Sequence, residues 1–267
     1  MRNFNIFVEF VQLIFYAINV IMFYFEEING KKILKSSILS GLTHFFTTRE
    51  SVIKTKEPEF ENIVEENKKD ICKYLQIEEE NFIHPSQTHT SNVDVAKVGV
   101  SVYPDTDGLI LTNKVQAVFL NFADCTPVII YDPLNKIAAV SHAGWRGTAA
   151  KIAYKTVQKM SEEFGSAPVN LKAAIGPAIS FCCYNVGEDV YRQLMVSVRN
   201  FKNLSEIREG SIFVDLKGIN KRQLIEAGLK VENIDVCPFC TVCNNELFFS
   251  YRRENGTTNR HSAVVKL

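Results

Sequence analysis

The stretch that decides the fold is Asn121–Ala150, NFADCTPVIIYDPLNKIAAVSHAGWRGTAA. It holds two apolar runs, each of which predicts a buried strand and ends beside a reactive side chain. Cys125 begins the first run and His142 ends the second, just before a glycine-rich turn and a helix-like segment. A thiolate and an imidazole at neighbouring strand ends predict either a metal site or a Cys/His nucleophile pair.

The composition is that of a globular protein that buries a full core. Of the 267 residues 46% are hydrophobic, and 30 basic side chains balance 30 acidic ones, so the net charge is zero. This balance argues against a nucleic-acid partner. Seven cysteines are an odd number and too few for a disulfide scaffold of this length, so we expect reduced thiols and a cytoplasmic location.

Residues 1–25 form a hydrophobic N-terminal extension of uncertain status. Sixteen consecutive residues, 10–25, carry no charge, which is short of the about 20 residues of a typical membrane-spanning helix. No small-residue cleavage site follows, so a signal peptide is not expected. We favour a packed helix, or an upstream extension of a protein that starts at Met22, over a membrane anchor.

The rest of the chain, 26–267, predicts one mixed α/β domain, because no linker or repeat divides it. Asn29-Gly30 predicts a hairpin turn, and helices are expected within 57–80 and over about 148–164, 187–198 and 215–227. Further strands are expected at 93–98, 109–111, 115–122, 172–175, 234–236, 247–251 and 263–265.

His89, Cys125 and His142 are the candidate metal ligands, with sequence gaps of 36 and 17 residues. Three protein ligands with one open position describe a catalytic zinc site. The spacing is not a zinc-finger pattern, so only the fold can bring the three together. The structural alternative is a buried apolar thiol and two hydrogen-bonded histidines.

A second group of thiols, Cys237, Cys240 and Cys243, has the two-residue spacing of structural zinc or iron–sulfur sites. A matching second pair is missing, since only the adjacent Cys182-Cys183 remains elsewhere. We therefore favour three reduced thiols at the end of a strand over a structural metal.

Arginines supply candidate anion contacts. Arg146 lies in the turn before a helix, where backbone amides favour phosphate, and Arg252 belongs to a basic cluster near the C-terminus. Arg49 follows an alternating segment in an exposed position. For each of them, the alternative interpretation is a solvated loop charge.

At this point the sequence resembles the YfiH/laccase-domain family, whose members are described as multifunctional purine nucleoside phosphorylases and, in older naming, polyphenol oxidases. The resemblance extends from about His44 to the C-terminus. It rests on the blocks Gln87-Thr88-His89, Asp105–Leu109, Ala123–Val128, His142–Gly147, Ile175–Tyr184 and Phe249–Arg253.

The resemblance implies a compact single-domain α/β sandwich that binds zinc through His89, Cys125 and His142. It also implies phosphorolysis of adenosine, inosine, guanosine and methylthioadenosine, and deamination of adenosine. One departure is Thr258-Asn259-Arg260, where the family has Thr-Gly-Arg. Asparagine tolerates the left-handed backbone that a glycine adopts, so we expect modest consequences.

Roles follow as hypotheses. Deamination needs a carboxylate to move protons, and Asp124 is the nearest candidate in sequence; it could equally orient a histidine ligand. Phosphorolysis needs an anion site, for which Arg49, Arg146 and Arg252 are the candidates, and we expect Arg146 to be catalytic as well as phosphate-binding. The rival functions are a copper-dependent polyphenol oxidase, a metal-free hydrolase with Cys125 as nucleophile, and a non-enzymatic scaffold. The preferred nucleoside and the oligomeric state stay open.

Overall fold

The computed structural model describes residues 23–267, a mixed α/β fold with several sheets. The predicted extension 1–25 therefore lies outside the described residues, except for its last three, which belong to the first strand. The first sheet has six strands. Their order is β1 (Phe23–Ile28), β2 (Lys31–Ser36), β3 (Thr43–Thr47), β15 (His261–Lys266), β7 (Ala117–Phe122) and β4 (Phe82–Ile83).

The second sheet also has six strands and contains both apolar runs of the stretch Asn121–Ala150. Its order is β14 (Ile234–Val236), β10 (Lys172–Ile175), β8 (Thr126–Asp132), β9 (Ile137–Ala143), β6 (Gly108–Leu111) and β5 (Val93–Val95). β8 and β9 pair in antiparallel register. The prediction of two buried strands in this stretch is therefore confirmed.

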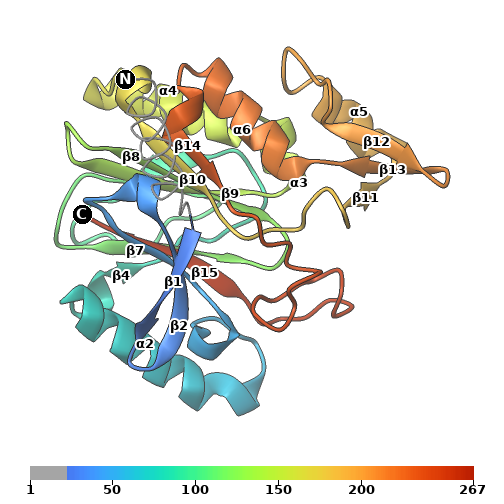
Figure 1. Cartoon of the computed structure of the whole chain (residues 1–267). Helices are drawn as coiled ribbons and strands as arrows, with labels where there is room; N and C mark the ends of the chain where they lie inside the picture. Colours follow the sequence, from blue (N-terminus) through green and yellow to red (C-terminus); the bar gives the residue numbers. More distant parts are fainter. Residues whose placement is uncertain (1–22) are drawn as a thin grey trace, which may run out of the picture.

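The two sheets pack face to face, and helices cover their outer faces. Ile129 and Tyr131 of β8 point into the core between the sheets, whereas Val128 and Ile130 pack toward the helices α4 (Ile152–Phe164) and α6 (Leu216–Glu226). Helix α2 (Glu61–Leu75) covers the outer face of the first sheet, on the opposite side of the molecule in Figure 1. β8 is apolar on both faces because both are buried.

A small third sheet lies beside this assembly. It consists of β11 (Asn185–Val186), β13 (Ser211–Val214) and β12 (Ser205–Arg208), and it packs with α5 (Glu188–Met195) around its own apolar cluster. None of the helices in the described part of the chain is long and apolar enough to span a membrane.

The predicted hairpin at Asn29-Gly30 is confirmed. Both residues have positive φ, 50° and 76°, and they join the antiparallel pair β1 and β2. This is the backbone that a tight two-residue turn requires.

One local prediction was confirmed only in part, and another was wrong. The helix expected over 148–164 is divided at Lys151, whose φ of 63° is left-handed, into α3 (Trp145–Ala149) and α4. The strand expected at Leu247–Tyr251 is a series of turns. There the amides of Leu247 and Phe248 donate to the carbonyl of Asn244 instead of to a neighbouring strand. Phe248 is buried without belonging to a sheet, so an apolar run alone mimicked a strand.

Candidate functional site

The candidate site lies at one end of the second sheet. In the antiparallel pair β8–β9, Pro127 is opposite His142, so Cys125, just before β8, comes close to the histidine at the end of β9. Asp107 precedes β6, and its carbonyl accepts a 2.7 Å hydrogen bond from the backbone amide of His142. The strand register thus brings an imidazole, a thiol and a carboxylate to the same end of the sheet.

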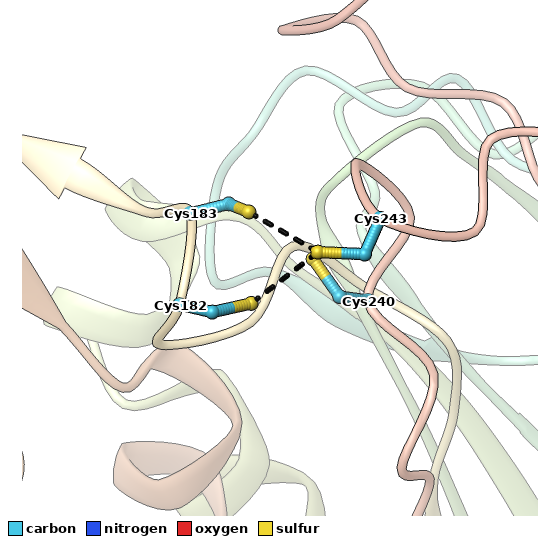
Figure 2. Close-up of side chains that lie close together, drawn as sticks. All are labelled: Cys182, Cys183, Cys240 and Cys243. Atoms are coloured by element: carbon cyan, nitrogen blue, oxygen red, sulfur yellow. Dashed lines mark hydrogen bonds between the residues drawn. The ribbon is translucent and has the colours of Figure 1, made fainter.

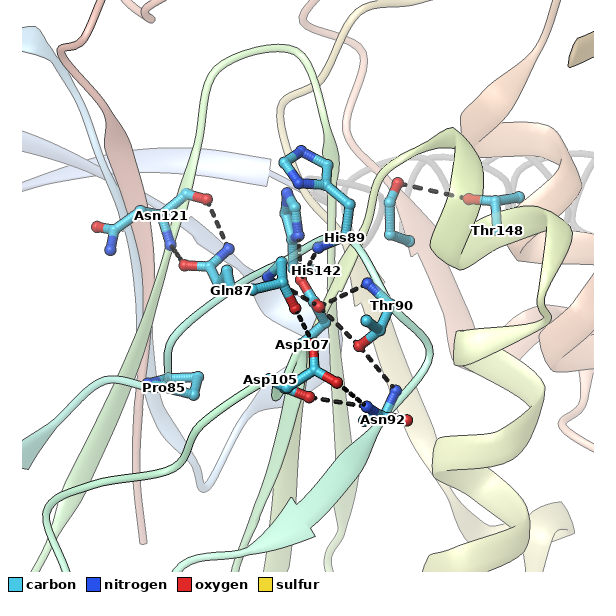
Figure 3. Close-up of polar contacts among 12 residues, drawn as sticks. Pro85, Gln87, His89, Thr90, Asn92, Asp105, Asp107, Asn121, His142 and Thr148 are labelled. Carbon is cyan, nitrogen blue, oxygen red and sulfur yellow. Dashed lines mark hydrogen bonds and ion pairs between the residues drawn. The ribbon is translucent and has the colours of Figure 1, made fainter.

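His89 reaches this place from the loop between β4 and β5. The side chain of Gln87 ties that loop to β7 by two hydrogen bonds with the backbone of Asn121, at 2.8 and 2.9 Å (Figure 3). The Asp107 carboxylate accepts from the backbone amide of His89 at 3.1 Å. His89 has a φ of 65°, a backbone conformation that is uncommon for a residue with a Cβ and that these contacts hold in place.

The three predicted ligands converge. One nitrogen of His89, one nitrogen of His142 and the sulfur of Cys125 lie within 4.8 Å of one another. His89 is exposed, Cys125 is half-buried and His142 is buried. Gly144 makes the convergence sterically feasible, because a Cβ there would lie 3.0 Å from the Cys125 Sγ and 3.1 Å from the His89 ring.

Asp107 orients His142. Its Oδ1 lies 2.7 Å from the His142 Nδ1, and a carboxylate only accepts, so Nδ1 donates and Nε2 is left free to bind a metal. Burial alone would raise the pKa of Asp107, but the hydrogen bond from His142 and those from Thr90 lower it to about 2. The carboxylate is therefore ionised under all ordinary conditions.

The thiol and the imidazole stabilise each other's charged forms. Burial would raise the pKa of Cys125, but the two histidines, and His142 first, lower it to about 6. Burial would lower the pKa of His142, but Cys125 and Asp107 raise it to about 9. A thiolate at neutral pH is both a metal ligand and a nucleophile.

The donor set fits a metal ion. Two imidazoles and one thiolate suit a tetrahedral zinc with one open position, and the exposed face of His89 leaves that position reachable from solvent. The same donors also suit copper, so the side chains alone do not determine which metal binds.

Asp124 lies beside the site and fastens the C-terminal loops to it. It has a φ of 80°. Its two carboxylate oxygens accept from the hydroxyl of Thr241 at 2.6 Å and from the backbone amide of Arg252 at 2.7 Å. In this arrangement Asp124 positions the loops that surround Cys125.

The three candidate arginines occupy different environments. Arg49 forms a 2.5 Å ion pair with Glu254 and stacks on Phe249, so its charge is already neutralised. Arg146 is exposed and stacks on its neighbour Trp145, and within the described part of the chain it makes no ion pair. Arg252 is exposed, and its guanidinium donates to the side chain of an asparagine at 2.6 Å.

Tyr184 is influenced by the charges of these groups, and the sequence alone did not identify it as a site residue. Burial raises the pKa of its phenol, and the charges of Cys125, Arg252, Asp124 and Arg146 all act on it. Tyr184 ends a sequence block that carries the family resemblance, but nothing in its local pattern distinguishes it from a core aromatic. Asp107 lies in the block Asp105–Leu109, and its local sequence does not indicate a functional role either.

Similar proteins are found by sequence and by structure. A family model described as "Multi-copper polyphenol oxidoreductase laccase" matches residues 46–267. A Bacillus subtilis (strain 168) protein named purine nucleoside phosphorylase YlmD is 32% identical over 214 residues, with 76% of each chain covered. A protein from an unknown prokaryotic organism, named adenosine deaminase RL5, is 30% identical over 190 residues, 67% of this chain and 72% of the relative.

A solved structure supports the same relationship. The crystal structure of the Bacillus licheniformis hypothetical protein YfiH has a TM-score of 0.83 at 29% identity, and the match covers 91% of this chain and 98% of that one. The names of these relatives describe different reactions, but the family match over residues 46–267 includes the whole second sheet and the three residues His89, Cys125 and His142, whereas β1 and β2 of the first sheet lie outside it. The chain therefore belongs to the laccase-like YfiH family, as the sequence motifs indicated.

Proposed function

We propose that this chain is a zinc-dependent purine nucleoside phosphorylase that also deaminates adenosine. The observation that carries the proposal is the convergence of His89, Cys125 and His142, with donor atoms within 4.8 Å, in a chain whose relatives bear these two enzyme names. A zinc ion held there would supply a Lewis acid with an open coordination position.

The protein's own residues supply positioning and charge. Asp107 holds the His142 ring through Nδ1, and Gly144 leaves room for Cys125 and His89 to meet. The Asp124 carboxylate is the acid–base candidate nearest to Cys125 in the sequence. For deamination it would move protons between water and the purine.

Phosphate would bind to Arg146 and Arg252. Both guanidinium groups are exposed, and the Arg252 guanidinium lies 5.7 Å from the centre of the Tyr184 ring, which supports a shared anion site. Arg49 is less suited to this role, because Glu254 already neutralises it. Exposed arginines bind phosphate through paired hydrogen bonds.

The test combines metal analysis with substrate assays. Purified protein is assayed for inosine phosphorolysis with phosphate, for adenosine deamination and for phenol oxidation with added copper. Cys125→Ala should bind about one zinc per chain fewer than the unchanged protein and should lose both nucleoside activities. Cys72→Ala, a buried thiol on α2, is the matched control and should keep them. A Cys125→Ala protein with normal zinc and full phosphorolysis would refute the proposal, and copper-dependent phenol oxidation alone would favour the rival function.

A further inference from the structure

Four cysteines gather at a second place, formed by two loops that are distant in sequence. Cys182 and Cys183 lie in the turn between β10 and β11, and Cys240 and Cys243 lie in the segment after β14 (Figure 2). Their four sulfur atoms all lie within 4.8 Å of one another. We call this set the four-cysteine cluster. The adjacent cysteines Cys182 and Cys183, which have no matching pair nearby in the sequence, thus lie beside the C-x-x-C pair Cys240 and Cys243.

Two of the sulfur–sulfur distances are close to those around a single tetrahedral ion. The Cys243 Sγ is 3.4 Å from that of Cys183 and 3.7 Å from that of Cys182. Zn–S bonds of about 2.3 Å in a tetrahedron separate the sulfurs by about 3.8 Å. A disulfide would instead require about 2.05 Å. Cys237, although it begins the C-P-F-C motif, is buried in the main core and is not part of the cluster.

Backbone contacts fix the position of the Cys240 sulfur. Cys240 pairs with Ala178 in an isolated bridge, and the amide of Ser180 donates to its Sγ at 3.4 Å. Thiolates are the form that binds zinc, and a two-residue spacing is usual for paired zinc ligands.

Two cations flank the cluster and would offset part of its charge, since one Zn²⁺ with four thiolates carries a net double negative charge. The buried Lys217 ammonium donates to the carbonyl of Cys237 at 2.7 Å, and the thiols of Cys240 and Cys182 act on it electrostatically. Arg208 donates to the backbone carbonyl of Cys182 at 3.5 Å and also pairs with Glu206 at 2.8 Å. The two cations would therefore offset part of the charge of a thiolate-rich ion in this place.

We propose that the four-cysteine cluster binds one Zn²⁺ as a structural site, separate from the His89–Cys125–His142 site. The four thiols release their protons as the ion binds, and no oxidant or reductant is required. All four ligands come from protein, so no position is left open for catalysis. The exposed Cys182 and Cys243 give the ion a path from solvent.

The zinc would fasten two loops that surround the candidate active site. Thr241, between two of the ligands, donates to Asp124 at 2.6 Å. Asn185, two residues beyond Cys183, accepts from Arg252 at 2.6 Å. An ion that bridges the two loops would therefore hold both contacts in register, which gives the cluster a role in positioning and stability.

The test separates the two sites by measuring metal per chain under reducing conditions. His142→Ala removes a ligand of the first site, and in that background the protein should still bind about one zinc per chain. Added Cys243→Ser should abolish that zinc, whereas added Cys237→Ser, the matched control outside the cluster, should leave it. The His142→Ala protein loaded with Co²⁺ should show the absorption of tetrahedral cobalt thiolate, a readout that does not depend on the folding of the cysteine variants.

A His142→Ala protein that binds neither zinc nor cobalt would overturn the proposal, and so would a Cys243→Ser variant that retains the zinc. Because no activity is measured, these outcomes are independent of the proposed nucleoside chemistry. In the His142→Ala background, Cys243→Ser should also lower Tm, and chelator should then no longer lower it further.

Discussion

Replacing Asp107 with asparagine tests how the carboxylate controls the metal ligands. Asp107 is 0% exposed and accepts five hydrogen bonds, from the amides of Thr88, His89 and Thr90, the Thr90 hydroxyl and the His142 ring. Three of the donors meet Oδ2 and two meet Oδ1. Asparagine keeps the shape but provides one acceptor oxygen and one NH₂ donor.

The asparagine oxygen is best placed at the position of Oδ2, where it accepts from the Thr88 amide and from the amide and hydroxyl of Thr90. The NH₂ group then takes the position of Oδ1 and faces the His89 amide and the His142 ring. The His142 Nδ1 must then become an acceptor, so its proton moves to Nε2, the nitrogen needed by a metal. Loss of such an orienting partner typically weakens metal binding about 10–100-fold, which is about 1.4–2.7 kcal/mol. The unpaired amide of His89 adds about 1–3 kcal/mol of lost folding stability.

Zinc affinity is measured by competition with a chromophoric chelator, and stability by urea unfolding of the metal-free protein. Asp105→Asn is the control, because Asp105 is exposed and its carboxylate contacts Thr88 and Asn92 but no histidine. Wild-type zinc affinity in Asp107→Asn would refute the reasoning about the tautomer. Equal losses in Asp105→Asn would show that loop packing, rather than the His142 contact, is responsible.

Two further predictions follow from single positions. Gly144→Ala should weaken zinc binding while all donors remain, because the new Cβ would lie 3.0 Å from the Cys125 sulfur and 3.1 Å from the His89 ring; equilibrium dialysis checks this, and unchanged affinity would contradict it. His44 is buried, and its Nε2 accepts from the Ser36 amide, so burial lowers its pKa from 6.5 to about 4. The stability that it contributes is complete above pH 6.5 and is lost as the pH falls toward 4, by up to about 1.4 kcal/mol per unit. Urea unfolding at pH 7 and 5 should show a smaller decrease in His44→Gln, and an unchanged decrease would contradict the assignment.

The sequence by itself determined the elements whose patterns are local. The apolar runs of β8 and β9 predicted buried strands, and Asn29-Gly30 predicted a hairpin, because a positive-φ turn is accessible to few residues. The long motifs also indicated the family. Local pattern failed at Leu247–Tyr251, where aromatic side chains are buried by loops and the backbone satisfies its hydrogen bonds in turns.

Only the tertiary structure decided which distant groups meet. His89, Cys125 and His142 were candidates from their residue types, but the strand register and the Gln87–Asn121 contacts bring their donor atoms together. Asp107 had no local signal, and the two-residue spacing of Cys240 and Cys243 did not reveal that Cys182 and Cys183 complete a cluster with them, since both arrangements depend on loops that meet only in the fold. The physical reason is that a ligand set is defined by a few ångströms in space, whereas sequence spacing limits only how far apart two residues can be.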